Sequence, residues 1–231
     1  MKNFIKKNFN LDKFIKSISV IYLYFCSNIF IILPMALFKL DLDKISLKTT
    51  SYLNLYISIV LILIIFLIYH KDLIKEFKSY INNFWDNFDT GLKQWLLGLL
   101  IMFVSNLILI FVFKASGANN ENAVQSLIKA SPFAMGLYTC LFAPFVEEIV
   151  FRKTLKDVFK NKKMFMIISF LFFGGAHVIT TAQNMIDLLY IIPYGALGAT
   201  FAYTYYETDS VFTTVTFHII HNSLLFFISL I

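Results

Sequence analysis

The sequence predicts an all-α protein, a polytopic membrane helical bundle of about seven transmembrane helices. Hydrophobic residues make up 58% of the 231-residue chain and charged residues 15%, and the mean hydropathy is +0.73. A soluble domain is nearer to half apolar and a quarter charged. Uncharged stretches close to the ~20 residues that cross a bilayer as a helix recur along the chain, and the charges cluster between them. Lysine-rich loops beside membrane helices then explain the net charge of +6 without a nucleic-acid partner.

The apolar stretches predict the spans in order: 17–38, 52–69, 94–113, 133–151, 164–180, 186–205 and 210–230. The basic start of the chain would suit a signal peptide, but the apolar run after it is long, shows no small-residue cleavage site and precedes further spans. We therefore expect an uncleaved first span. The sixth stretch is the weakest, because Pro193, Gly195 and Gly198 interrupt it.

The distribution of basic residues indicates the orientation in the membrane, since lysine and arginine mark cytoplasmic loops. Segment 1–16 holds five lysines, segment 70–93 holds four, and segment 152–163 holds five lysines and one arginine. Segments 39–51 and 114–131 hold three and two lysines. We therefore predict a cell-membrane protein with a cytoplasmic N-terminus and its C-terminus outside. The segment that fits this rule least well is 39–51.

The stretch FAPFVEEIVFRKTL places three ionisable side chains in an apolar span, where such a group costs ~3 kcal/mol or more and usually has a function. Glu148 and Arg152 are four residues apart on a helix and face each other. Glu147 is turned about 100° away. The planar guanidinium of Arg152, the chain's one arginine, can hold a carboxylate in a fixed orientation. We expect Arg152 to neutralise Glu148 and Glu147 to act as a general base, because a desolvated carboxylate without a cation is a stronger base.

Two later stretches supply further polar side chains. In FFGGAHV, Phe173 and His177 share a helix face, and the two glycines between them allow another helix to approach closely. In FHIIHNS, His218 and Asn222 again share a face. A histidine and an asparagine amide are suitable donors to an oxyanion.

A common site requires these side chains to lie at similar depths. His177 lies roughly 21 Å from the expected cytoplasmic edge at 1.5 Å per residue. Glu147 reaches a matching depth of roughly 20 Å only if its helix continues to about Lys160. We therefore predict one long helix from about Pro132 to Lys160. We expect Pro144 to kink it one turn before the glutamates.

Several of these residues also have plain structural interpretations. Glu148 and Arg152 could serve packing specificity as a buried ion pair. His221 is about 60° from the other histidine of its stretch by helical repeat, and we interpret it as packing. Cys26 and Cys140 lack a C-x-x-C spacing and are interpreted as small buried hydrophobes.

Together the three stretches resemble the CPBP family, also called the CAAX prenyl endopeptidase or Abi family. The residues that carry the resemblance are Glu147, Glu148 and Arg152 in E-E-x-x-x-R, Phe173 and His177 in F-x-x-x-H, and His218 and Asn222 in H-x-x-x-N. The resemblance covers about 133–229 and implies an intramembrane endopeptidase. It implies that Glu147 and His177 activate a water and that His218 and Asn222 stabilise the oxyanion.

The resemblance divides the chain into an N-terminal membrane region, 1–131, with three spans, and a CPBP-like catalytic core, 132–231, with four. It implies a hydrophobic peptide or membrane-protein substrate. Bacterial members of the family are linked to bacteriocin self-immunity and to peptide-pheromone processing, which are the settings we expect.

Other chemistry and other functions stay open at this point. One glutamate with two or three histidines could bind zinc with a water in the fourth position. We favour a metal-free water and no cofactor, because no H-E-x-x-H arrangement is present and Asn222 is a poor zinc ligand. The alternative function is a non-catalytic immunity or scaffold protein that binds a peptide or receptor. A carrier that relays protons through Glu and His ranks last, since it lacks the paired broken helices of many carriers.

Overall fold

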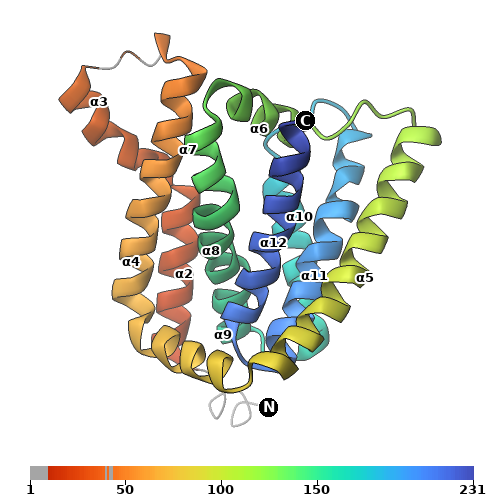
Figure 1. Ribbon diagram of the computed structural model, residues 1–231. Coiled ribbons are helices and arrows are strands. Elements are labelled where there is room, and N and C mark those ends of the chain that lie inside the picture. Colours follow the sequence, from red (N-terminus) through yellow and green to blue (C-terminus); the bar gives the residue numbers. More distant parts are fainter. Residues whose placement is uncertain (1–9, 40, 42–43) are drawn as a thin grey trace.

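The computed structural model describes residues 10–39, 41 and 44–231, and all regular secondary structure in these residues is helical, as predicted. The helices form one bundle, and α6 lies across the end where the C-terminus is found (Figure 1). The helices are α2 (Leu11–Phe25), α3 (Ile32–Phe38), α4 (Leu47–Asn82), α5 (Phe84–Phe111), α6 (Asn119–Ala130), α7 (Pro132–Leu137), α8 (Ala143–Glu148), α9 (Thr154–Val158), α10 (Lys162–Val178), α11 (Ile191–Thr208) and α12 (Val211–Ser229).

Within the described residues, four or five helices are long and apolar enough to cross a membrane, rather than the seven expected. The four are α4, α5, α12 and the helix Pro132–Val158 that joins α7, α8 and α9. The fifth is the pair Leu11–Phe25 and Ser27–Phe38, which is bent by 58° at Cys26. Cys26, predicted to be buried, is exposed at this bend.

The two predicted spans that are not among these form α10 and α11. They have 17 and 18 residues. At 1.5 Å per residue they rise about 26–27 Å, slightly less than the ~30 Å hydrocarbon core. Both helices nevertheless run alongside the longer ones in the bundle (Figure 1).

The boundaries of helix α4 differ most from the predicted ones. It has 36 residues, whereas the predicted span covered only 52–69. The segment 70–93, expected to be a polar connection, is helical apart from a break at Asn83, whose side-chain amide donates to the Ser79 carbonyl. A 36-residue helix rises about 54 Å, so α4 extends well beyond a hydrocarbon core.

Contacts of Glu76 explain why α4 continues. Its Oε1 lies 2.6 Å from the Nζ of the buried Lys153 and accepts a 3.1 Å hydrogen bond from the Tyr205 hydroxyl. Its Oε2 accepts from the Val211 backbone N–H at 2.9 Å. One carboxylate therefore ties α4 to the helix of the glutamate pair, to α11 and to α12. The sequence analysis did not identify this cluster, since its members are far apart in the chain.

The helix Pro132–Val158 matches the long helix predicted for 132–160. Two π-helical turns, Tyr138–Phe142 and Ile149–Lys153, flank α8. Such turns occur often at functional sites. The helix remains continuous through Pro144, which follows the first of these turns.

Each π-helical turn shifts the backbone pairing by one residue, and a hydroxyl or amide group binds a carbonyl beside it. The N–H of Ala143 donates to the Tyr138 carbonyl, and Pro144 has no N–H to give. The Thr139 carbonyl accepts instead from the side chain of Asn222 at 2.9 Å. At the second turn the Thr154 hydroxyl donates to the Val150 carbonyl.

Glycines allow α10 and α11 to pack closely, as predicted for the glycine pair of α10, although only Gly174 of that pair meets α11. A Cβ added to Gly174 would lie 2.7 Å from the backbone oxygen of Ile191, and one added to Gly198 would lie 2.8 Å from that of Ser169. Only glycine permits these backbone contacts.

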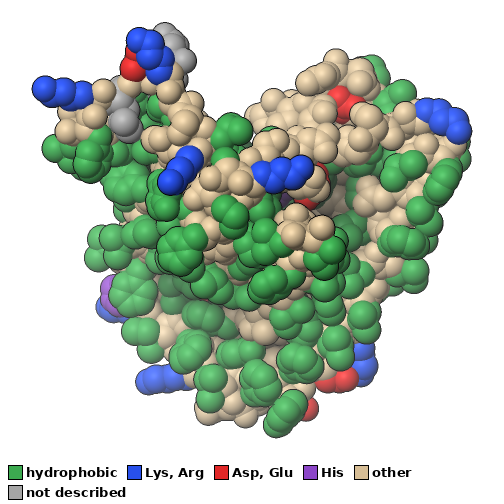
Figure 2. Space-filling model, turned by 45° about the horizontal axis from the view of Figure 1, so that its top comes forward, with side chains coloured by type: hydrophobic (Ala, Val, Ile, Leu, Met, Phe, Trp, Pro, Cys, Tyr) green, Lys and Arg blue, Asp and Glu red, His purple; other side chains and the backbone are tan. Residues whose placement is uncertain are grey.

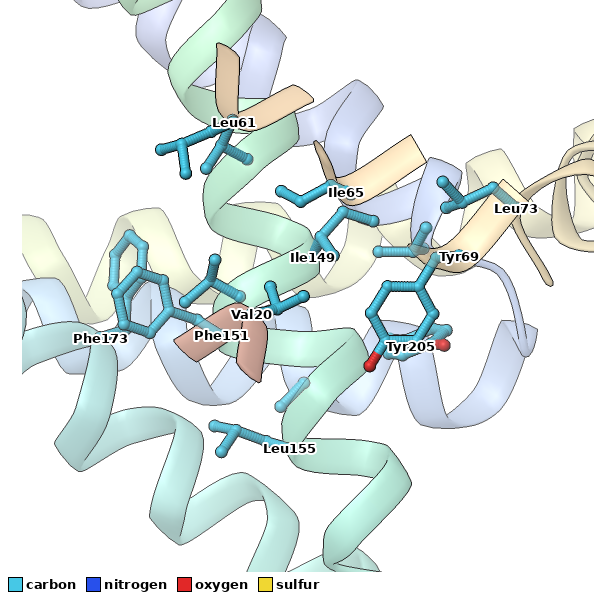
Figure 3. Close-up of a cluster of buried hydrophobic side chains, with 14 of the residues drawn as sticks. Val20, Leu61, Ile65, Tyr69, Leu73, Ile149, Phe151, Leu155, Phe173 and Tyr205 are labelled. Atoms are coloured by element: carbon cyan, nitrogen blue, oxygen red, sulfur yellow. The ribbon is translucent and has the colours of Figure 1, made fainter. Parts of the chain in front are cut away.

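A buried hydrophobic cluster joins the N-terminal helices to the helix of the glutamate pair. Figure 3 shows Val20 of α2 and Ile65 of α4 beside Ile149 and Phe151. Phe173 belongs to the same cluster, and its ring meets that of Phe151 edge-on at 5.5 Å. This core therefore reaches the F-x-x-x-H stretch and helps to fix its position.

The segments richest in basic residues lie together at one end of the bundle. Segment 152–163, the α4–α5 connection and the start of α2 lie at one end of the bundle, and the C-terminus lies at the other (Figure 1). The first lysines of the tail, at positions 2, 6 and 7, lie outside the described residues. Figure 2 shows hydrophobic side chains over much of the flank, which suits contact with lipid.

Candidate active site

A cavity of about 220 Å³ brings together most of the residues selected from the sequence. It lies among α6, the helix Pro132–Val158, α10, α11 and α12. The predicted site residues that line it are Glu147, Phe173, His177, His218 and Asn222. Glu148 and Arg152 do not line the cavity; both side chains are fully buried behind it.

Glu147 faces both predicted histidines. Its Oε2 lies 3.8 Å from the Nε2 of His177 and 3.7 Å from the Nε2 of His218. Both distances exceed the usual hydrogen-bond range, and polar groups at such separations can be bridged by a water. The sequence placed Glu147 near these histidines only by assuming similar depths, and the structure confirms that proximity.

The protonation pattern of His177 follows from its neighbours. Its Nδ1 lies 2.9 Å from the Phe173 carbonyl, which can only accept a hydrogen bond. Nδ1 therefore carries the proton, and the Nε2 of the neutral ring keeps its lone pair toward Glu147. The ring packs against Phe173, with centroids 4.4 Å apart, and stacks on Tyr194 at 4.8 Å. Phe173 and His177 therefore share a helix face, as their spacing predicted.

A chain of charged and polar groups runs from Arg152 to His218. The Arg152 Nε lies 3.2 Å from Glu148 Oε2, which confirms the predicted pair. Glu148 Oε1 then accepts from the Nδ1 of His218 at 2.8 Å. This carboxylate fixes the ring so that its Nε2 points toward Glu147.

Arg152 is held in an apolar environment. Its guanidinium carbon lies 4.4 Å from the centre of the Phe173 ring and 5.7 Å from that of Phe201. Within the described residues its Nη atoms have no hydrogen-bond partner. Stacking on two rings partly compensates a desolvated cation. Arginine suits this position better than lysine, because its charge is spread over a plane.

The structure also places in the cavity residues that the sequence analysis missed or interpreted as packing. His221, interpreted as packing, is buried and lines the cavity, and its Nδ1 has no hydrogen-bond partner among the described residues. Asn120 and Glu121 of α6 line it as well, and the Asn120 amide donates to the Tyr194 hydroxyl at 3.4 Å. Only the position of His221 in an apolar stretch could have identified it; α6 carried no motif.

A metal ion in the cavity would have to be held by a group of His, Cys, Asp or Glu side chains. In the part of the chain that the structure describes, no three His, Cys, Asp or Glu side chains are grouped so as to hold a metal ion. The distances from Glu147 to the two histidines leave room for a small polar molecule, such as water, that contacts all three.

Comparison with known proteins agrees with the motifs. Residues 129–224 match the family described as type II CAAX prenyl endopeptidase Rce1-like. YdiL of Bacillus subtilis (strain 168), whose name proposes it as a membrane peptidase, is 29% identical over 109 residues. That alignment covers 46% of this chain and 41% of YdiL, so the chain spans less than half the length of this relative. No solved structure matches the chain.

Proposed function

We propose that this chain, whose residues 129–224 form an Rce1-like type II CAAX prenyl endopeptidase domain, is an intramembrane endopeptidase. Its substrate is a hydrophobic peptide or a membrane protein, and the nucleophile is a water activated by Glu147. The observation that carries the proposal is the position of Glu147, 3.8 Å and 3.7 Å from two histidine Nε2 atoms that share its cavity. Arg152 is paired with the neighbouring Glu148, so it leaves Glu147 available as a base.

In the first step, a water between Glu147 and His177 attacks the carbonyl carbon of the scissile peptide bond. Its proton moves to the carboxylate of Glu147, and the carbonyl π electrons move to the oxygen. The Nε2 lone pair of His177 accepts a hydrogen bond from the second hydrogen of the water, which stays on the oxygen, and this contact orients the attack. This role fits the tautomer of His177, because the Phe173 carbonyl holds the proton on Nδ1 and leaves Nε2 free to accept.

The oxyanion requires donors, and His218 is positioned for this role. Because its Nδ1–H already donates to Glu148, it can donate at Nε2 only when both ring nitrogens carry protons. The hydrogen bond to Glu148 holds the ring in the orientation that this donation requires. Asn222 uses one amide N–H on the Thr139 carbonyl, and its second N–H supplies the other donor.

In the second step, the tetrahedral intermediate collapses and the carbon–nitrogen bond breaks. Glu147 returns its proton to the leaving nitrogen, which departs as an amine, and the carbonyl side leaves as a carboxylic acid. Protons and electrons balance without a cofactor or a metal ion.

Cleavage by the purified protein tests this function. The protein in lipid nanodiscs is incubated with peptides prepared from a membrane-protein digest, and new termini are identified by mass spectrometry. We expect cleavage by the wild type and a loss of roughly 10²–10⁴-fold for His177→Ala, the range for removing acid–base assistance. A chelator is expected to leave the wild-type rate unchanged.

The outcomes of this assay separate the candidate functions. Full loss with chelator, restored by added zinc, would replace the metal-free mechanism. If the wild type cleaves no peptide and His177→Ala keeps its biological activity, the protein is a non-catalytic immunity or scaffold protein. Bacteriocin self-immunity and pheromone processing are the two settings in which we place a peptidase of this kind.

We also propose that the lysine-rich end of the bundle faces the cytoplasm. Lys129 is exposed on α6, at the C-terminal end of the bundle, and Lys160 lies at the opposite end. In a background without Cys26 and Cys140, an impermeant maleimide added to intact cells should label Lys129→Cys and spare Lys160→Cys. The reverse pattern would invert the orientation.

A further inference from the structure

A second cavity, of about 250 Å³, lies on the other side of Glu147. It is formed by the bend after α2, by α4, and by facing residues of α8 and α10. Its lining includes the polar side chains Ser27, Asn28, Asn54, Ser58 and Thr180. None of the histidines that line the first cavity lines the second.

The two cavities meet at the proposed catalytic carboxylate. Five residues line both of them: Tyr24, Tyr138, Ala143, Glu147 and Ala176. Two of the five are alanines, whose side chains occupy little space at the boundary, and two are tyrosines. Glu147 is therefore accessible from both cavities, with the histidines on one side only.

The N-terminal part of the chain supplies two serines and two asparagines to the lining of the second cavity. Asn28 and Asn54 belong to separate helices in the two most N-terminal predicted spans, and both lie outside the region that matches the family. Each interrupts an otherwise apolar stretch. Amide side chains at membrane depth are unfavourable unless they find partners, and such positions are commonly functional. These two line the same cavity, beside the apolar side chains of Ile57 and Leu61.

We propose that the second cavity is a substrate subsite, which binds the peptide chain on one side of the scissile bond while the first cavity binds the other side. The inference rests on the proposed endopeptidase function. An endopeptidase must hold its substrate on both sides of the bond that it cuts, and the base must lie between the two halves. Glu147 occupies that position at the boundary of the two cavities.

The lining of the second cavity indicates the chemistry of the segment that it binds. An asparagine amide both donates and accepts, so Asn28 and Asn54 match the exposed N–H and C=O groups of an extended peptide backbone. Ile57 and Leu61 offer an apolar wall to a hydrophobic side chain of the same segment. The subsite therefore takes an extended, hydrophobic peptide segment, and the N-terminal helices contribute to specificity.

Filling the cavity tests the subsite. Ser58 is 5% exposed and lines the second cavity but not the first. The larger side chain of Ser58→Phe should therefore obstruct the second cavity. Val124→Phe obstructs the first cavity, and Leu63→Phe, at a position 61% exposed on the flank of α4, is the matched control. The peptides from the membrane-protein digest are used again, and residue preferences are determined on each side of the cleaved bond.

We expect Ser58→Phe to change the preference on one side of the bond only and to raise KM by roughly 10-fold, the loss of about 1.4 kcal/mol of binding. Val124→Phe should change the residue preference on the other side of the bond. Leu63→Phe should change the preference on neither side. If Ser58→Phe does not fold, Asn54→Leu replaces it, with a smaller shift on the same side.

Two results would overturn the subsite. In the first, the Ser58→Phe and Asn54→Leu proteins cleave with wild-type KM and wild-type preferences. In the second, kcat falls while the preferences stay unchanged, which would make the cavity a route for water. Absence of any cleavage by the wild type would instead remove the proposed function itself.

Discussion

Glu147→Gln should reduce kcat for peptide cleavage by roughly 10²–10⁴-fold, because the glutamine amide cannot accept the proton of the attacking water. The substitution keeps the size of the side chain, so the cavity and the contacts with both histidines are preserved in shape. The measurement is the single-turnover rate on the best peptide from the digest, at saturating enzyme. Thermal unfolding of the variant should match that of the wild type.

A matched surface substitution controls for loss of charge. Glu207 is partly exposed and pairs with Lys162 at the end of the bundle opposite α6, so Glu207→Gln should leave the rate unchanged. A Glu147→Gln protein that keeps more than about a tenth of the wild-type rate would contradict the assignment of the base, since loss of a general base is expected to cost at least 10²-fold.

Arg152→Met should destabilise the protein by about 3–5 kcal/mol, the effect of leaving one buried charge without its partner. Glu148 would remain fully buried, with His218 and the Thr214 hydroxyl beside it and no arginine to balance its charge. The measurement is thermal or denaturant unfolding in the nanodisc. Arg152→Lys should lie between the wild type and Arg152→Met, because lysine retains the charge and loses the planar contact with the two phenylalanine rings.

The double variant Glu148→Gln with Arg152→Met separates a packing role from a functional one. It removes both buried charges, so we expect it to recover much of the stability that Arg152→Met loses. Activity should stay low, because a neutral glutamine holds the Nδ1 of His218 by a weaker hydrogen bond than the carboxylate does. A double variant that is both stable and fully active would show that the pair serves packing alone.

These two experiments address different parts of the same site. Glu147 contacts the water and the substrate directly in the proposed mechanism. Glu148 and Arg152 are positioning residues, since they act through His218. A variant of the pair should therefore lower kcat through the orientation of His218, whereas Glu147→Gln removes the proton acceptor itself.

The helical class and the pairing within each motif could be predicted from the sequence, because both depend on local spacing. Apolar runs predict helices wherever they occur. Residues four apart on a helix meet whatever surrounds them, so the Glu148–Arg152 pair and the Phe173–His177 contact were predicted correctly. The long helix beginning at Pro132 was also predicted, because Glu147 reaches the membrane depth of His177 only if its helix continues.

The boundaries and number of the spans could not be predicted in the same way. Hydropathy ended the second span at residue 69, while α4 continues to Asn82 because Glu76 binds groups from three other helices. Those partners lie 77 to 135 residues further along the chain. No local pattern records such contacts.

The sequence by itself determined which ionisable and amide side chains stand in the apolar stretches and so which residues were selected for the candidate site. The tertiary structure alone decided how they meet: Glu148 with His218, 70 residues away, His221 inside the cavity, and a second cavity built from the N-terminal helices. The physical reason is the range of the interactions. Helical periodicity fixes neighbours within one turn, whereas the packing of helices against one another depends on the whole surface that each presents.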